Sequence, residues 1–129
     1  MPDEQNKKRI LVVDDNEGMR RLLVTILPHY GEYEVVVALD GQDALNKLRQ
    51  QPADLVISDV DMPIMDGLKL LITLRQDTAL AHIPVIIMSG EDYERRAQVA
   101  SSYNAQFIRK PLELDQILQA VKQALAPAT

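Results

Sequence analysis

Residues 55–67 of this chain read LVISDVDMPIMDG, and this stretch decides the fold. The apolar run at 55–58 predicts a buried strand, and Asp59 stands where that strand gives way to a loop. A carboxylate is costly inside a core but useful at its rim, because the loops at strand ends carry binding and catalytic residues. A single aspartate at a strand end is more often only a cap or a turn residue. A functional interpretation of Asp59 therefore needs support from the rest of the chain.

The composition indicates one folded domain. The chain has 129 residues, of which 47% are hydrophobic and 26% charged, and this is typical of globular proteins. We expect a flexible tail at 1–8, a domain over 9–126, and a tail or the start of a linker at 127–129. The net charge of −5 argues against a nucleic-acid surface, and the absence of cysteine excludes disulfides and thiolate metal sites. Because the sequence has neither a long apolar span nor a secretion signal, we expect a cytoplasmic protein without a membrane partner.

Strands and helices are predicted to alternate along the chain. Apolar or half-polar runs predict strands at residues 10–13, 33–38, 55–58, 85–88 and 106–109. Residues at helical spacing lie between and after them, at 19–27, 44–48, 68–74, 91–103 and 114–125. The helix over 91–103 has the fewest apolar positions, so we expect it to be loosely packed and accessible. Strict alternation predicts a parallel sheet covered on both faces, with right-handed connections.

The polarity of the strands predicts their order. The strands at 10–13, 55–58 and 85–88 are uninterrupted apolar runs, as central parallel strands are. The strands at 33–38 and 106–109 include charged or amide side chains and therefore suit the edges. The expected fold is a single flavodoxin-like (βα)5 doubly wound α/β domain with a five-stranded parallel sheet in the order 2-1-3-4-5. In such sheets, ligands bind beyond the carboxyl ends of the strands, where the order reverses.

A set of polar side chains follows the predicted strands. Asp14 and Asp15 follow the first strand, Asp59 the third, Ser89 the fourth and Lys110 the fifth. Because the carboxyl ends of parallel strands share one edge, residues that are far apart in sequence should meet in one crevice. Each residue alone could be a cap or a solvated loop residue. As a set they predict a functional site.

The residue types predict the chemistry of that site. Carboxylates held close together repel by about 4 kcal/mol per pair at an effective dielectric constant near 20, so a cation should lie among them. Oxygen ligands without His or Cys favour a hard ion, and a small set that leaves room for a phosphoryl oxygen favours Mg²⁺ over Ca²⁺. With the ion bound, one carboxylate can attack phosphorus and form an acyl phosphate. Lys110 offers a point charge and Ser89 a hydroxyl donor for the phosphoryl oxygens.

The chain resembles a receiver (CheY-like) domain of the two-component response-regulator family over most of its length, from Arg9 to about Leu125. The resemblance rests on the residues at 14–15, 52–59, 62–67, 89 and 107–111. It implies that Asp59 is the phosphoacceptor and that Ser89 and Lys110 hold the phosphoryl group. It also implies that Mg²⁺, or Mn²⁺ in its place, is bound by Asp14, Asp15, Asp59 and the main-chain carbonyl of Asp61. Phe107 matches the aromatic switch position that responds when Ser89 moves.

Some positions vary within that family. Ser89 stands where threonine is more frequent, and we expect its hydrogen bonding to be the same. Asp61 and Glu91 should face the approach of the attacking water, where their charge could slow or speed dephosphorylation. Tyr93 and the pair Arg95-Arg96 are typical of a solvated face, on a segment that the family uses to meet partners. His29 and His82 lie in predicted loops, so the chain is expected to lack a phosphodonor of its own.

The resemblance implies a phosphorylation-dependent signalling switch rather than an enzyme that acts on other substrates. The expected donor is a sensor histidine kinase or a histidine phosphotransfer protein. The expected output surface comprises the helix over 91–103, the strand over 106–109 and the helix over 114–125. It would contact a downstream protein, an effector domain outside these residues, or a second copy in a homodimer.

Two other functions were weighed. Asp59 and Asp61, with a later serine and lysine, also resemble haloacid-dehalogenase-type phosphatases, which form an aspartyl phosphate. In those enzymes the nucleophile follows the first strand, and this chain has no room for their cap or later acidic motif. The other alternative is a phosphate-independent scaffold, which would have no need for so costly a cluster of carboxylates.

Overall fold

A computed structural model describes residues 7–127 of the chain. Residues 1–6 and 128–129, which we expected to belong to terminal tails, lie outside the described residues. The first strand begins at Lys8, one residue before the expected start of the domain. Within the described part, no helix is long and apolar enough to cross a membrane.

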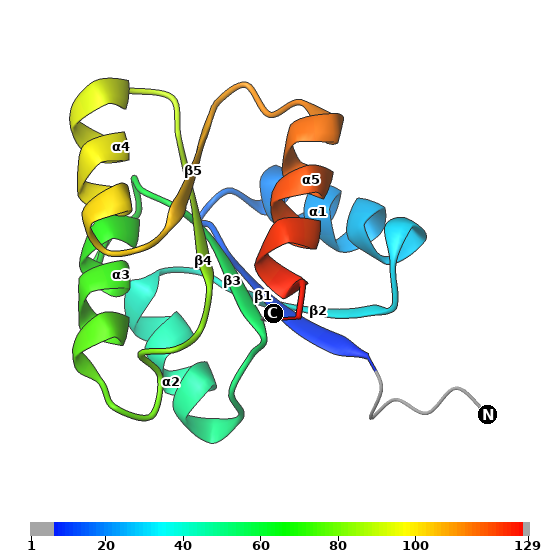
Figure 1. The fold of residues 1–129 in the computed structure, drawn as a ribbon, viewed down its shortest axis with the longest axis horizontal. Helices are drawn as coiled ribbons and strands as arrows, with labels where there is room; N and C mark the ends of the chain where they lie inside the picture. Colours follow the sequence, from blue (N-terminus) through cyan, green and yellow to red (C-terminus); the bar gives the residue numbers. More distant parts are fainter. Residues whose placement is uncertain (1–6, 128–129) are drawn as a thin grey trace.

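Strands and helices alternate from β1 to α5, with one short 3₁₀ helix, η2 (Figure 1). The strands are β1 (Lys8–Val13), β2 (Tyr33–Ala38), β3 (Leu55–Asp59), β4 (Val85–Ser89) and β5 (Gln106–Arg109). The helices are α1 (Glu17–Ile26), η2 (Leu27–Tyr30), α2 (Gly41–Gln50), α3 (Gly67–Gln76), α4 (Tyr93–Ser102) and α5 (Leu114–Leu125). The predicted helix at 19–27 therefore ends one residue early and continues as the 3₁₀ turn that contains Pro28.

The five strands form one parallel sheet in the order β2-β1-β3-β4-β5. This confirms the predicted fold class and strand order. Every residue of β3 and β4 is buried, whereas the edge strands β2 and β5 are only partly buried. Burial on both faces explains why the central strands are continuous apolar runs.

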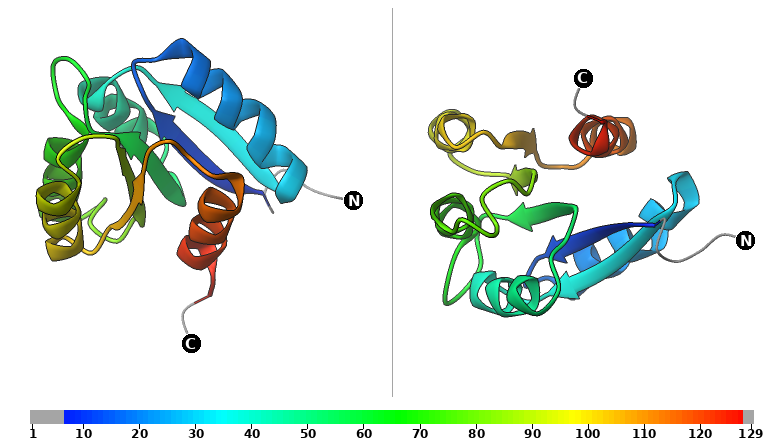
Figure 2. Two further views of the ribbon diagram at one scale, coloured as in Figure 1. Left: turned by 90° about the horizontal axis from the view of Figure 1, so that it is seen from above. Right: turned by 60° about the horizontal axis from the view of Figure 1, so that its bottom comes forward.

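The helices cover the two faces of the sheet unequally (Figures 1 and 2). Helices α2, α3 and α4 lie on one face, and their apolar residues form one core with alternate residues of the strands. Helices α1 and α5 lie on the other face over a second core, which includes Leu23, Leu27 and Ile117. Because side chains alternate across a strand, one buried strand such as β3 supplies both cores.

Side-chain caps fix the starts of the first three helices. Asn16, Asp40 and Asp66 each accept a hydrogen bond from the main-chain N–H three residues later, which satisfies a donor that the helix itself leaves free. Helix α4 has no side-chain cap, and Ala100 is its only buried residue. The prediction that the fourth helix is accessible is thus confirmed.

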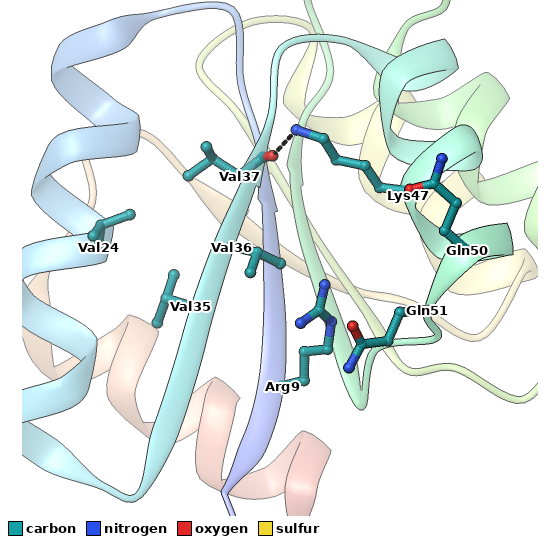
Figure 3. Close-up of a pocket in the computed structure, with 8 residues that line it drawn as sticks. All are labelled: Arg9, Val24, Val35, Val36, Val37, Lys47, Gln50 and Gln51. Carbon is teal, nitrogen blue, oxygen red and sulfur yellow. Dashed lines mark hydrogen bonds between the residues drawn. The ribbon is translucent and has the colours of Figure 1, made fainter. Parts of the chain in front are cut away.

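A shallow hollow lies at the exposed edge strand β2 (Figure 3). The residues that line it are Arg9, Val24, Val35, Val36, Val37, Lys47, Gln50 and Gln51. Lys47 Nζ donates to the Val37 carbonyl at 2.6 Å and so occupies one acceptor of the open strand edge. The hollow contains none of the predicted site residues.

Candidate functional site

The predicted site residues lie at the carboxyl ends of four strands. Asp14 directly follows β1, Asp59 ends β3, Ser89 ends β4, and Lys110 directly follows β5. The strand ends are level with one another, because Val13 pairs with Ser58, Asp59 with Met88, and Ser89 with Arg109. Figure 1 shows the connections that leave β4 and β5 along the same edge of the sheet.

Three carboxylates form the centre of the site. Oxygen atoms of Asp14, Asp15 and Asp59 all lie within 4.8 Å of one another. Asp14 and Asp59 are buried, with 1% and 5% exposure, whereas Asp15 is exposed. All the donors are carboxylate oxygens, which suit a hard divalent cation better than a soft one.

Asp14 is the least satisfied of the three. Its Oδ1 accepts a hydrogen bond from the Asn16 N–H at 3.0 Å, whereas its buried Oδ2 has no hydrogen-bond partner among the described residues. Burial raises the pKa of Asp14 above its ordinary value of 3.8, and the nearby Asp59 and Asp15 carboxylates raise it further, against the lowering effects of the Asn16 N–H and Lys110. An unpaired acceptor beside two other acids is where a cation would be most stabilising.

Lys110 supplies a positive charge to this cluster. Its Nζ lies 2.8 Å from Asp59 Oδ1, and its side chain is 28% exposed against 7% for Asp59. The main-chain N–H of Lys110 donates to the Ser89 carbonyl at 2.9 Å, which ties the end of β5 to the end of β4. The ammonium group is therefore held at the rim, where it can contact both Asp59 and a ligand bound to it.

Ser89 is fully buried, and its hydroxyl group makes three hydrogen bonds. Oγ donates to the Glu91 carbonyl at 3.0 Å and accepts from the Glu91 N–H at 3.3 Å. It also accepts from Arg96 Nη1 at 2.8 Å. Both bonds to Glu91 involve its main chain, and Glu91 itself is exposed.

Asp61 is bound to the same arginine. Arg96 Nη1 and Nη2 each lie 2.9 Å from one carboxylate oxygen of Asp61. This bidentate pair lowers the pKa of Asp61, mainly through the hydrogen bond from Arg96. Asp61 and Ser89, which lie on different loops, are thereby joined through one guanidinium group.

Phe107 lies half-buried on β5, where it packs against the core under α4. Its ring meets the ring of Tyr93 edge to face, with a centroid distance of 5.4 Å. The Arg109 guanidinium lies 5.0 Å from the centre of the same Tyr93 ring. Phe107 and Arg109 lie two residues apart and therefore on the same face of β5, so Tyr93 joins the start of α4 to that face, and it is more than a solvated residue.

Arg96 was expected to lie with Arg95 on a solvated face, and its role in the site was not predicted. The Arg96 side chain is only 15% exposed, against 75% for Arg95. Helical spacing could have indicated this, because position 96 is three residues after Tyr93 and four before the buried Ala100. The interpretation of Arg96 as a solvated residue was wrong, and that of Arg95 is confirmed.

Gly67 lies where there is no room for a side chain. A Cβ atom at this position would lie 2.1 Å from the Asp59 carbonyl oxygen and 3.0 Å from Ser58 Oγ. Only glycine lets the start of α3 approach the end of β3 so closely. Gly67 thus helps to hold the backbone of Asp59, while the neighbouring Asp66 caps α3.

Comparison with known proteins identifies the family to which these features belong. The family pattern described as "Response regulator receiver domain" matches residues 10–122. The signal receiver domain of a signal transduction histidine kinase from Syntrophus aciditrophicus is 32% identical, with a TM-score of 0.84 over 92% of this chain and 90% of that one. The Vibrio cholerae chemotaxis protein CheY4 is 28% identical, with a TM-score of 0.83 over 92% and 99% of the two chains. The receiver domain of the Francisella response regulator 1452 is 27% identical, with a TM-score of 0.84 over 92% and 97%.

Proposed function

This chain belongs to the response regulator receiver domains of two-component signalling, and we propose that Asp59 is its phosphoacceptor. The donor in this proposal is the phosphohistidine of a sensor histidine kinase or of a histidine phosphotransfer protein, and the exchange takes place in the cytoplasm. The observation that carries the proposal is the setting of the Asp59 carboxylate at the end of β3. It lies 2.8 Å from Lys110 Nζ and in one cluster with Asp14 and Asp15.

The proposed step is a direct phosphoryl transfer. One carboxylate oxygen of Asp59 forms a bond to phosphorus while the phosphorus–nitrogen bond of the phosphohistidine breaks. The leaving imidazole keeps the bonding electron pair and takes a proton from solvent. A carboxylate needs no general base for this attack. In dephosphorylation, a water oxygen forms a bond to phosphorus while the phosphorus–oxygen bond to Asp59 breaks. Asp59 leaves as a carboxylate, and the water gives up a proton to solvent as inorganic phosphate is released.

The acidic cluster fits a divalent cation. Mg²⁺, or Mn²⁺ in its place, would be held by Asp14, Asp15, Asp59 and the main-chain carbonyl of Asp61. The buried, unpartnered Oδ2 of Asp14 supports this assignment, as does a donor set made of oxygen alone. When bound, the ion offsets the negative charge of the carboxylates and of the phosphoryl oxygens.

Two side chains are proposed to hold the transferred group. Lys110 offers its ammonium group to a phosphoryl oxygen, since it already contacts Asp59. Ser89 offers its hydroxyl group, which must first leave the Glu91 carbonyl. The movement of Ser89 frees space next to β5, and Phe107 responds as the aromatic switch. Asp61 and Glu91 modulate how long the phosphoryl group survives, because they lie on the two loops beside Asp59.

The output surface in this proposal is formed by α4, β5 and α5. Helix α4 is suited to the role, because Ala100 is its only buried residue and most of its surface faces solvent, where a partner can bind. A downstream protein, an effector domain outside these residues, or a second copy of the chain would read the change.

The proposal is tested by incubation with acetyl phosphate and MgCl₂, followed by intact-mass measurement. We expect the mass of one phosphoryl group to be added, to be removed by hydroxylamine, and to be absent in excess chelator. Asp59→Asn should abolish uptake, and the exposed Asp115→Asn should serve as a matched control with normal uptake. A hydroxylamine-labile phosphate on Asp59→Asn would refute the assignment. Rapid turnover of a phosphate monoester by the wild-type protein would favour the phosphatase instead.

A further inference from the structure

Arg96 joins three parts of the site that are separate in the sequence. It lies in α4, contacts Ser89 at the end of β4, and reaches Asp61 in the loop after β3. Nη1 contributes to both contacts, at 2.8 Å to Ser89 Oγ and 2.9 Å to Asp61 Oδ2. The planar guanidinium group suits this bridge, because it offers several donors in fixed directions.

The hydrogen bonds of Ser89 are all in use in this arrangement. A serine hydroxyl has one donor and two acceptor positions. The donor is directed at the Glu91 carbonyl, and the acceptors receive the Glu91 N–H and Arg96 Nη1. Arg96 has no acceptor to offer. While it is bound, the hydroxyl hydrogen must therefore turn away from it, toward Glu91.

We propose that Arg96 is a positioning residue that holds the Ser89 hydroxyl in its resting place and thereby opposes binding of a phosphoryl group at Asp59. This inference rests on the function proposed above. The guanidinium group is fixed by two hydrogen bonds to Asp61 and by the position of Arg96 on α4. Ser89 can therefore move toward Asp59 only if its bond to Arg96 breaks. The strength of this latch sets how readily the unphosphorylated protein adopts the switched state.

The electrostatics of the pair agree with a fixed latch. The Asp61 carboxylate raises the pKa of Arg96, so the guanidinium group keeps its charge. The Arg96 side chain is 15% exposed and that of Asp61 54%, so the shielded part of the bridge is the charge-assisted hydrogen bond from Arg96 to Ser89. A simple charge argument gives the opposite expectation, since a nearby cation should attract a phosphoryl group. The sign of the effect therefore separates the two roles.

The test uses fluoroberyllate, a stable phosphoryl analogue, with Mg²⁺ and the full chain. Calorimetric titration should show a Kd about three- to tenfold lower for Arg96→Gln than for wild type, the range expected for one hydrogen bond of ordinary strength. Arg95→Gln is the matched control, because it removes the same charge from the neighbouring position, where the side chain is exposed. It should stay within about twofold of wild type. Unchanged or weaker binding by Arg96→Gln would overturn the inference.

A second arm asks whether the effect passes through Ser89. In a Ser89→Ala background, Arg96→Gln should no longer improve fluoroberyllate binding, since there is no hydroxyl group to release. A persistent gain would overturn the latch, as a purely structural loosening of α4 would act with or without Ser89. Arg96→Lys should also bind more tightly than wild type, because lysine lacks the planar fork that pairs with both Asp61 oxygens and also reaches Ser89. A lysine variant that matches wild type would contradict the need for the bridge.

The controls also separate this inference from the proposed function. Wild-type protein that takes up no fluoroberyllate in Mg²⁺ would overturn both. Binding by wild type, with loss in Asp59→Asn and no gain in Arg96→Gln, would overturn the latch alone.

Discussion

Asp14 has a carboxylate in a place that water barely reaches. The residue is 1% exposed, and one of its oxygens has no hydrogen-bond partner among the described residues. Its raised pKa means that the folded protein binds this proton more tightly than the unfolded chain does. The contribution of Asp14 to stability is thus fully present below its ordinary pKa and is lost as the pH rises through the raised value. At neutral pH, the ionised Asp14 carboxylate therefore lowers the free energy of unfolding.

Asp14→Asn should therefore stabilise the metal-free protein. An asparagine keeps the acceptor for the Asn16 N–H and places an amide donor beside Asp15 and Asp59. We expect the free energy of unfolding at pH 7, in chelator, to rise by about 1–2 kcal/mol, as measured by urea denaturation.

The pH dependence and a neighbouring variant provide the checks. The gain should shrink as the pH falls toward 3.8, because wild-type Asp14 then becomes neutral. Asp15→Asn should change stability far less, since Asp15 is exposed. A destabilised Asp14→Asn protein in chelator would show that the buried carboxylate has a stabilising partner after all.

At the scale of single elements, an arginine joins α3 to two loops at the amino ends of the strands. Arg75, near the end of α3, donates Nε to the Tyr103 carbonyl at 2.7 Å. Nη1 donates to the Ala81 and Ile83 carbonyls at 3.1 and 2.7 Å, and Nη2 to the Asn104 carbonyl at 3.3 Å. These carbonyls belong to the loops that lead into β4 and β5. Burial lowers the pKa of Arg75, as expected for a cation held by carbonyl groups alone.

Arg75→Met should therefore lower the free energy of unfolding by about 2–4 kcal/mol, because it leaves several loop carbonyls unpaired. Arg49→Met is a close control, since Arg49 is also the last-but-one residue of its helix but is exposed. We expect that variant to stay within about 0.5 kcal/mol of wild type in the same urea titration. Equal losses in the two variants would assign the effect to helix ends in general.

The elements also show what could be predicted from the sequence and why the rest could not. Strand order followed from polarity, because burial on both faces excludes charged side chains from β1, β3 and β4 along most of their length. The acids, the serine and the lysine were placed at one edge because a parallel sheet brings its strand ends together. The bridge from Arg96 was not predicted, since it depends on where α4 packs. The hydrogen bonds of Arg75 were not predicted either, because their acceptors are main-chain carbonyls, which leave no signal in the sequence.

The two ends of the strands differ in character. The carboxyl end of the sheet carries buried or crowded charge in Asp14, Asp59 and Lys110. The amino end is held by the four hydrogen bonds from Arg75 to main-chain carbonyls. The two cores on either face connect the ends through fully buried strands. A change in charge at Asp59 should therefore act on α4, which contacts Ser89 through Arg96, since the buried sheet and the end held by Arg75 resist it.

This arrangement predicts where hydrogen exchange should change when fluoroberyllate and Mg²⁺ bind. Amides in the loops after β1, β3 and β5 should exchange more slowly, because their residues become bound to the ligand. Amides in the first turns of α4 should change as well, because Ser89 withdraws from Glu91 and Arg96. The amides next to Arg75, in the loops before β4 and β5, should keep their rates. Exchange that changes equally at both ends of the strands would mean that the whole sheet responds. The prediction of a switch confined to α4 and its neighbours would then be wrong. With Asp59→Asn all these differences should vanish, which separates ligand binding from the effect of the salt itself.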